Sequence, residues 1–255
     1  MKIASWNVNS LRAREDQVLD WLEVNRPDVL CMQELKMVDQ EFPTDAFGDL
    51  GYDVAFFGQR AYNGVAIASR DDLVDVVRGF PGDPPDAERR LLAATIGGIR
   101  IIDIYLPNGQ ELGSPKYEYK LRWLEQLLDF LRAGPGPETP LLICGDYNIA
   151  PLDLDVWDGG GREGLFVSPA ERRGFLRLLE WGLVDAFRHF HPDEPKQYTW
   201  WDYRAGGFER NKGMRIDHFL VTRSVLARAK GVTIDRKMRA NEQPSDHVPI
   251  VLELE

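Results

Sequence analysis

The stretch that decides the fold is PLLICGDYNIAP, residues 140–151. Its apolar run at 141–144, bounded by a proline and a glycine, predicts a strand buried on both faces. The strand delivers Asp146 and Asn148 to its end, and alternation along an extended chain places both side chains on one side. Such an oxygen-rich pair suits a hard cation such as Mg²⁺, or a phosphate held through one. The alternative is an ordinary Asp turn at a strand end.

Length and composition favour one soluble domain. With 255 residues, no linker and only loop-sized Pro/Gly-dense stretches, the chain predicts a single domain over residues 1–255. It has no apolar window long enough to span a membrane and no leader peptide pattern, which predicts a cytoplasmic protein without a membrane partner. Cys31 and Cys144 lie inside apolar runs, so we expect buried thiols and no disulfide between them.

The charge is acidic overall but unevenly distributed. A net charge of −10 argues against strong nucleic-acid binding. Acidic residues crowd residues 39–53 and 153–158, whereas Arg and Lys concentrate in residues 204–215 and 236–239. A basic face on an acidic body therefore stays open, with weak non-specific affinity for DNA at physiological salt.

The first half of the chain predicts further strands. A strand at residues 3–8 ends on Asn7, and a buried strand at 28–32 is followed by Glu34. Two hairpins are expected, residues 52–57 with 64–69 and residues 91–96 with 100–106. Strands joined by tight turns are antiparallel, so a simple doubly wound parallel sheet is disfavoured.

Three helices are predicted, at residues 11–25, 115–132 and 169–181. For the last of these, Ser168 is the expected N-cap and Glu171 falls three residues after it. Residues 71–85 are rich in loop formers, and two strands at 215–221 and 248–254 close the chain.

Chemically active side chains gather at strand exits or in loops beside strands. They are Asn7, Glu34, Tyr105, Asp146, Asn148, Asp217, Asp246 and His247. Each could be an ordinary strand terminus, but if they converge on one rim of a sandwich they form a metal and phosphate site. His218, next to Asp217, points to the opposite face of its strand by alternation and is expected to be structural.

Seven motifs follow one another along nearly the whole chain: WNVNSLRAR, LCMQELK, YNGVAIASR, IYLPNG, GDYNIAP, YTWWDYRAGGFERNKGMRIDHFL and PSDHVPIV. In this order they resemble the endonuclease/exonuclease/phosphatase superfamily and, within it, the bacterial exodeoxyribonuclease III type of apurinic/apyrimidinic (AP) endonuclease. The resemblance implies a four-layered α/β sandwich of two mixed, largely antiparallel β-sheets flanked by helices, with the site at one end.

The resemblance also implies dependence on Mg²⁺ or Mn²⁺. The candidate metal ligands are Asn7, Glu34, Asp146, Asn148, Asp246 and His247. Glu34, with Asn7 beside it, is the expected principal ligand, and Asp146, Asn148 and Asp246 match positions of a second or alternative metal. How many ions act at once stays open.

The residue types suggest roles in phosphodiester hydrolysis. Water is the expected nucleophile because no Ser or Cys lies in a suitable motif, and Asp146 is the candidate to orient or deprotonate it. His247 would contact the scissile phosphate, with Asp217 fixing its tautomer. The expected donors to the phosphate oxygens are Asn7, Asn148 and Tyr105. Whether Asp146 or His247 is the base stays open.

The aromatic and basic segment after residue 198 is the candidate DNA-binding surface. Trp200 matches a family aromatic that walls a pocket for a base-free sugar. Arg204, Arg210, Lys212 and Arg215 are expected to hold backbone phosphates. The alternative is a solvated loop around core aromatic residues.

These expectations describe a DNA-repair nuclease that cleaves 5′ to abasic sites, with 3′ to 5′ exodeoxyribonuclease and 3′-phosphodiesterase or phosphatase activity. The expected partner is double-stranded DNA with abasic sites or 3′ ends, bound by a monomer. Two alternatives remain. One is a same-fold enzyme acting on inositol or sphingolipid phosphoesters, and the other is a DNA-binding relative that does not cleave.

Overall fold

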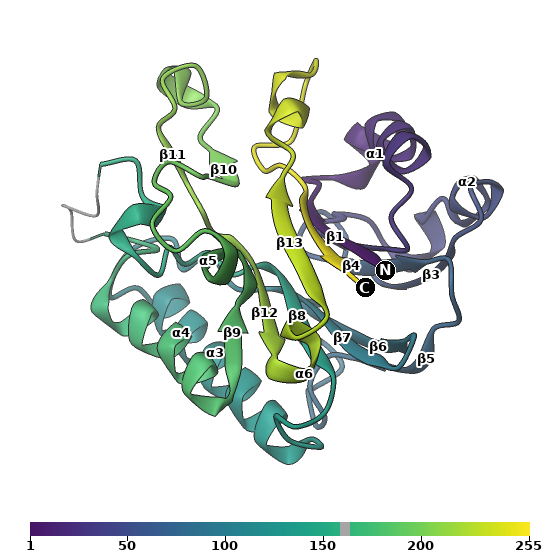
Figure 1. Ribbon diagram of the computed structural model, residues 1–255. Helices are drawn as coiled ribbons and strands as arrows, with labels where there is room; N and C mark the ends of the chain where they lie inside the picture. The colour runs from purple at the N-terminus through teal and green to yellow at the C-terminus, as the bar shows by residue number, and fades with distance from the viewer. Residues whose placement is uncertain (159–163) are drawn as a thin grey trace.

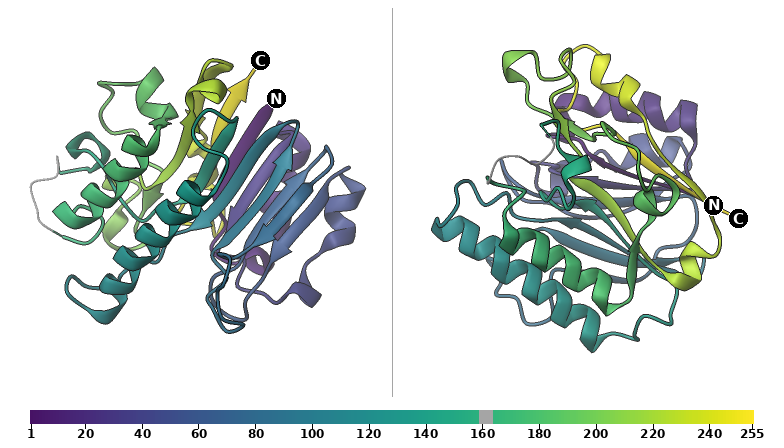
Figure 2. Two further views of the ribbon diagram at one scale, coloured as in Figure 1. Left: turned by 90° about the horizontal axis from the view of Figure 1, so that it is seen from below. Right: turned by 60° about the vertical axis from the view of Figure 1, so that its left-hand side comes forward.

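Two six-stranded β-sheets pack face to face with helices on their outer surfaces (Figures 1 and 2). The computed structural model describes residues 1–158 and 164–255. The expected fold class, two mixed and mostly antiparallel sheets flanked by helices, is confirmed.

The first sheet contains both ends of the chain. Its strands, in spatial order, are β13 (Ala229–Ile234), β14 (Ile250–Leu254), β1 (Lys2–Asn7), β2 (Val29–Gln33), β4 (Val65–Ser69) and β3 (Asp53–Phe57). Within it β1 and β2 are parallel and the other neighbouring strands are antiparallel. Helix α1 (Leu11–Asn25) makes the crossover between the parallel strands, and α2 (Thr44–Asp49) precedes β3.

The second sheet repeats this arrangement. Its strands, in spatial order, are β5 (Val74–Arg78), β6 (Leu91–Ile96), β7 (Ile99–Tyr105), β8 (Leu141–Asp146), β12 (Asp217–Thr222) and β9 (Leu183–Asp185). Here β7 and β8 are parallel and are joined by α3 (Pro115–Ala133), whereas the other neighbours are antiparallel. The carboxyl ends of a parallel pair therefore lie at one edge of each sheet.

The remaining α-helices and a short ribbon lie on the second sheet, against the core between the two sheets, and beyond the sandwich. They are α4 (Pro169–Trp181), α5 (Ala186–Phe190), α6 (Arg223–Leu226) and the two-stranded ribbon β10 (Trp200–Trp201) with β11 (Gly213–Met214). Helix α4 begins as predicted, because Ser168 Oγ accepts from the Glu171 amide at 3.2 Å and the Glu171 carboxylate accepts from the Ser168 amide at 3.0 Å.

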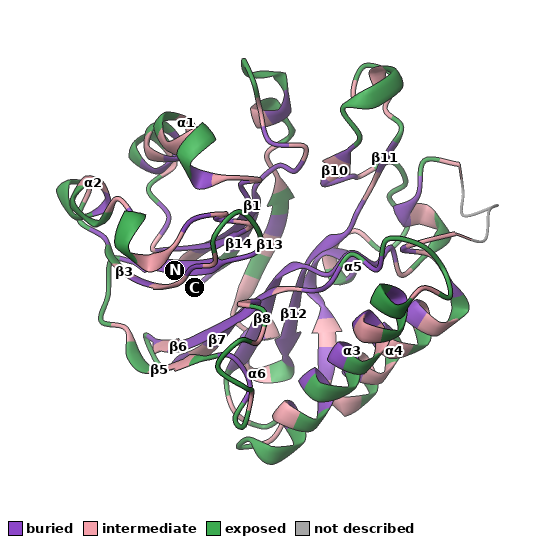
Figure 3. Cartoon of the chain, turned by 180° about the vertical axis from the view of Figure 1, so that it is seen from behind, coloured by how far each residue is buried: buried purple, intermediate pink, exposed green. Residues whose placement is uncertain are grey.

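Apolar side chains fill the spaces between the layers, and the central strands are buried while the helices expose their outer faces (Figure 3). Between the sheets, Ile3 and Ile67 of the first pack with Ile101 and Phe219 of the second. Separate clusters lie beneath α1 and beneath α3 and α4. Cys31 and Cys144 are buried free thiols in the layer between the sheets. No helix in the described ranges is long and apolar enough to cross a membrane.

The sequence did not predict the edge strands β5 and β13, nor the short strands β9, β10 and β11. Strand β5 lies within residues 71–85, which were predicted as loop, and β13 lies in a stretch with no predicted strand. Both are edge strands, and their residues are mostly exposed or half-buried, so the apolar pattern that identifies central strands is weak in them.

Candidate active site

The site forms where parallel strands of both sheets end. On β1 and β2, Asn7 pairs with Gln33, which places Glu34 just past the end of β2. On β7 and β8, Tyr105 pairs with Asp146. Each sheet therefore contributes two adjacent polar side chains at the same rim, and sheet packing brings the two pairs together.

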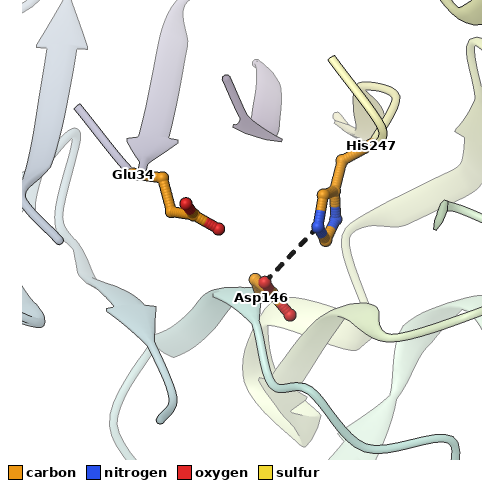
Figure 4. Close-up of side chains that lie close together, drawn as sticks. All are labelled: Glu34, Asp146 and His247. Atoms are coloured by element: carbon orange, nitrogen blue, oxygen red, sulfur yellow. Dashed lines mark ion pairs between the residues drawn. The ribbon is translucent and has the colours of Figure 1, made fainter. Parts of the chain in front are cut away.

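Glu34, Asp146 and His247 point toward one another at this rim (Figure 4). One ligand atom from each of them lies within 4.8 Å of the other two. The predicted meeting of side chains that are scattered along the chain is confirmed for these three. The two carboxylates supply oxygen donors that fit a divalent cation.

Asn7 joins the two sheets at the site. Its buried amide nitrogen donates to Glu34 Oε1 at 2.9 Å and to Asp146 Oδ2 at 3.0 Å. Burial alone would raise the pKa of Glu34, but the Lys36 ammonium at 2.9 Å from Oε2 and the Asn7 amide outweigh it and lower that pKa. Glu34 is therefore ionised at neutral pH and can bind a cation.

Asp146 and Asn148 form one hydrogen-bonded unit. The Asn148 backbone amide donates to Asp146 Oδ1 at 2.8 Å, and the Asn148 side chain donates to the Leu106 carbonyl at 3.0 Å. Asn148 adopts a φ of 49°, the left-handed conformation that Asn tolerates better than most residues. Burial raises the pKa of Asp146 to about 7, although the cationic His247 opposes this shift.

His247 is held by Asp217 as the sequence predicted. Its Nδ1 lies 2.9 Å from Asp217 Oδ2, and its Nε2 lies 3.6 Å from Asp146 Oδ2. Burial lowers the pKa of His247, but the two carboxylates dominate and raise it to about 10. The imidazole is therefore protonated at neutral pH, so both ring nitrogens donate and Nε2 faces the site.

Tyr105 lies beside the two carboxylates. Burial, together with the charges of Glu34 and Asp146, raises the pKa of its hydroxyl well above the usual value. The Arg90 guanidinium stacks on its ring, 4.6 Å from the centroid. Tyr105 therefore keeps its proton at neutral pH and can act as a hydrogen-bond donor.

Asp246 lies beside the three-residue cluster and is held by two donors. Asn9 Nδ2 donates to it at 2.8 Å, and Trp200 Nε1 donates at 3.0 Å. Asp246 does not belong to the compact ligand group that the described residues form. It therefore connects the cluster to the aromatic segment.

Sequence reasoning missed three polar residues of this rim: Asn9, Lys36 and Asn108. Asn9 accepts from the Lys36 ammonium through its side-chain oxygen, and Lys36 also pairs with Glu34. The Asn108 side chain donates to Asn148 Oδ1 at 3.2 Å. All three lie within the quoted motifs WNVNSLRAR, LCMQELK and IYLPNG, two or three residues from a predicted site residue, which was the available signal.

An apolar wall flanks the polar cluster. Trp200 pairs with Met214 across the ribbon of β10 and β11, and both pack against Ile216. The Phe166 ring stands edge-on to Trp200, with 6.2 Å between the ring centroids. Trp200 is half-buried.

The predicted basic residues divide into two groups. Arg204, Arg210 and Lys212 are exposed, and the Lys212 ammonium lies 4.5 Å from the centroid of the Trp157 ring. The expectation that Arg215 holds a backbone phosphate is wrong. Arg215 is 1% exposed and its guanidinium is fully engaged by buried partners.

Those partners are Asp155, Asp185 and His218. Arg215 donates to Asp155 at 2.7 and 3.0 Å, to Asp185 at 3.2 and 2.8 Å, and to His218 Nδ1 at 2.8 Å, which uses all five N–H groups. The Arg188 guanidinium also pairs with Asp155, at 2.6 Å. His218 is structural, as expected, because it is buried and its Nε2 lies 2.8 Å from the Ile149 carbonyl oxygen.

Comparison with known proteins assigns the family. The profile of the Endonuclease/Exonuclease/phosphatase family matches residues 4–247, and the chain belongs to this family. The chain is 37% identical to Exodeoxyribonuclease III of Haemophilus influenzae, over 98% of this chain and 98% of that protein.

Two solved structures share nearly the whole fold. The 3′ phosphatase NExo from Neisseria, bound to a product DNA hairpin, matches with a TM-score of 0.96 and 44% identity over 100% of this chain and 99% of its own. An AP endonuclease from Archaeoglobus fulgidus matches with a TM-score of 0.95 and 41% identity over 100% of this chain and 99% of its own. These matches confirm the predicted class, a hydrolase of the exodeoxyribonuclease III type.

Proposed function

We propose that this DNA-repair nuclease hydrolyses the phosphodiester bond 5′ to abasic sites and trims blocked or normal 3′ ends of duplex DNA, using Mg²⁺ or Mn²⁺. The observation that carries the proposal is the convergence of Glu34, Asp146 and His247, with His247 oriented by Asp217. This arrangement places negative oxygen donors, a general base and a cationic hydrogen-bond donor around one point.

The metal fits the residues that are present. Glu34 is the proposed principal ligand, and Asp146 would be a further ligand. A bound divalent cation would neutralise phosphate charge and stabilise the departing 3′ oxygen. Oxygen donors favour Mg²⁺ or Mn²⁺ over softer metals. The Lys36 ammonium, 2.9 Å from Glu34 Oε2, helps to keep this carboxylate ionised, which supports its role as a ligand.

The side chains supply the proton transfers and the phosphate contacts. Asp146, with a pKa of about 7, can accept a proton from water as the water oxygen attacks phosphorus. The bond from phosphorus to the 3′ oxygen then breaks, and that oxygen takes up a proton from solvent water while Asp146 returns its proton to solvent. His247, with a pKa of about 10, is a poor base at neutral pH and instead donates from Nε2 to a phosphate oxygen. These protonation states favour Asp146 over His247 as the base.

The apolar wall supports an abasic substrate. Trp200 and Met214, which are half-buried and packed over Ile216, offer an apolar surface that suits a sugar without a base, and the buried Phe166 ring supports Trp200. Asp246 ties this wall to the polar cluster through Trp200, which would place the sugar next to the scissile phosphate. Exposed Arg204, Arg210 and Lys212 would hold backbone phosphates without reading sequence.

We further propose that residues 1–255 form a single catalytic domain that acts as a monomer in the cytoplasm. The two sheets share one apolar core and jointly build the site, which supports one domain. The full-length similarity to a bacterial Exodeoxyribonuclease III supports the location.

One assay tests the proposed function. Three duplexes are compared, bearing an internal abasic analogue, a 3′-phosphate or a recessed normal 3′ end, each with Mg²⁺ and with EDTA. We expect Mg²⁺-dependent cleavage or phosphate release that stops in EDTA. Asp146→Asn serves as the inactive variant, and Asp20→Asn, an exposed carboxylate on α1, serves as its control.

The relative rates on the three duplexes rank abasic incision against 3′-end processing. Both activities are represented in the names of the similar structures, an AP endonuclease and a 3′ phosphatase. Absence of product from all three duplexes with either Mg²⁺ or Mn²⁺ would overturn the proposal. Hydrolysis of an inositol phosphate in place of DNA would favour the alternative substrate class.

A further inference from the structure

Lys120 is a fully buried ammonium behind the candidate active site. It lies on α3, the helix that crosses from β7 to β8, and its side chain is 0% exposed. Its Nζ donates to the Asn148 carbonyl at 2.7 Å and to the Asn108 carbonyl at 3.2 Å. The third N–H group of the ammonium donates to the Glu171 carboxylate. All three N–H groups of the ammonium therefore have partners.

The two carbonyls belong to the loops that leave β7 and β8. Asn108 and Asn148 are also joined through their side chains, because Asn108 Nδ2 donates to Asn148 Oδ1 at 3.2 Å. Asn148 in turn holds the Asp146 carboxylate through its backbone amide. One ammonium thus fixes the backbone of both loops at the point where their side chains face the reacting groups.

Glu171 holds the ammonium from the opposite side. Its carboxylate accepts from the Phe166 amide at 3.1 Å, and from the Ser168 amide at 3.0 Å and the Ser168 hydroxyl at 2.7 Å. The residue is 0% exposed and caps the N-terminus of α4. The Lys120 ammonium also lies 4.9 Å from the centroid of the Phe166 ring, which borders Trp200. The pair therefore connects the catalytic loops with the apolar wall.

We propose that Lys120 is a positioning residue: by binding the Asn108 and Asn148 carbonyls it sets the geometry of the Asp146 unit, and Glu171 holds the ammonium in place. This inference rests on the proposed nuclease function. Lys120 touches neither the cluster of Glu34, Asp146 and His247 nor solvent, so it acts through Asn108 and Asn148. A misplacement of about 1 Å among reacting groups can lower the rate about 100-fold. Loss of the Lys120 contacts is therefore expected to lower kcat.

A buried ion pair that only links α3 to α4 would behave differently. Replacing such a pair by neutral residues is often tolerated, whereas removing one partner leaves a buried charge. The decisive variant is therefore the double substitution Lys120→Met with Glu171→Gln. It removes both charges, and Gln can still accept from the amide of Phe166 or Ser168. It does not replace the donors to the Asn108 and Asn148 carbonyls.

Two measurements test the proposal: steady-state cleavage of whichever of the three duplexes the unmodified protein cleaves fastest, and unfolding in urea. For the double variant we expect kcat to fall about tenfold or more, with KM within about twofold and an unfolding midpoint near that of the unmodified protein. Glu171→Gln alone keeps the carbonyl contacts and should retain kcat within about threefold. Arg122→Met, which breaks an exposed ion pair on the same helix, is the control and should leave kcat unchanged.

A folded double variant with unchanged kcat would overturn the proposal, as would a loss confined to KM. If the double variant does not fold, Lys120→Met alone is assayed at a temperature where its circular dichroism matches that of the native protein. The same loss of kcat is then expected, and retained kcat again overturns the role. An unmodified protein that cleaves none of the three duplexes would instead refute the proposed function.

Discussion

Replacing Arg215 separates a structural role from a DNA-binding role for the basic segment. Arg215 sits between the carboxylates of Asp155 and Asp185, and all three side chains are buried. In Arg215→Met, Asp155 keeps Arg188 as a partner, but Asp185 loses its ion-pair partner. The variant therefore carries an uncompensated buried carboxylate.

The cost follows from this geometry. Removing one partner of a buried ion pair typically destabilises a protein by about 3 to 5 kcal/mol. For a chain of this size that corresponds to a melting temperature lower by roughly 6 to 20 °C. The apolar Met side chain recovers part of the packing, so the lower half of the range is the expected result.

Urea unfolding and salt-dependent DNA binding provide the assay. Arg215→Met should lower the unfolding midpoint strongly and leave the slope of log K against log salt unchanged, because Arg215 cannot reach a phosphate. Lys212→Ala should do the opposite, reducing that slope by about 0.9 for a lost phosphate contact. An Arg215→Met protein of native stability with a reduced slope would refute the structural role.

Two further predictions concern pH. Burial raises the pKa of Asp103, whose Oδ1 accepts a hydrogen bond from Gln33 at 2.6 Å. The folded chain therefore keeps a proton on Asp103 that the unfolded chain releases above about pH 4. As a result, the free energy of unfolding falls as pH rises. Asp103→Asn should match the unmodified protein near pH 4 and exceed its urea midpoint near pH 8; an equal midpoint at both pH values would contradict this. Burial and the Arg215 charge lower the pKa of His218 from 6.5 to about 4. The contribution of His218 to the free energy of unfolding is therefore complete above pH 6.5 and falls by roughly 3 kcal/mol as pH drops to 4. His218→Gln should lose this acid sensitivity and His189→Ala, an exposed control, should keep it; identical profiles for the two would exclude the mechanism.

The sequence predicted the central part of the fold because central strands are apolar and their exits are polar. The runs that lead to Asn7, Glu34 and Asp146 are buried strands with polar ends, and parallel pairing places those ends at one rim. The edge strands β5 and β13 were missed because one or both faces meet solvent, which removes the apolar signal.

Arg215 was misjudged because its partners come from distant parts of the chain. Its charge and its place in a basic loop suggested a solvent-facing role. The structure brings Asp155 and Asp185 around it, and no local pattern predicts this long-range pairing. Lys120 was overlooked for a similar reason, since a lysine on a helix is usually exposed.

The central claim is that Glu34, with Asp146 as a further ligand, binds one divalent ion, and that these carboxylates act together with His247 on one phosphodiester bond. The most direct test measures Mn²⁺ binding by electron paramagnetic resonance and single-turnover duplex cleavage on the same Glu34→Gln sample, with exposed Glu23→Gln as control. We expect weaker Mn²⁺ binding together with a cleavage rate reduced about 100-fold or more, and native values for Glu23→Gln. The account would be contradicted if Glu34→Gln kept both its Mn²⁺ affinity and its cleavage rate within about tenfold of the values for the unmodified protein.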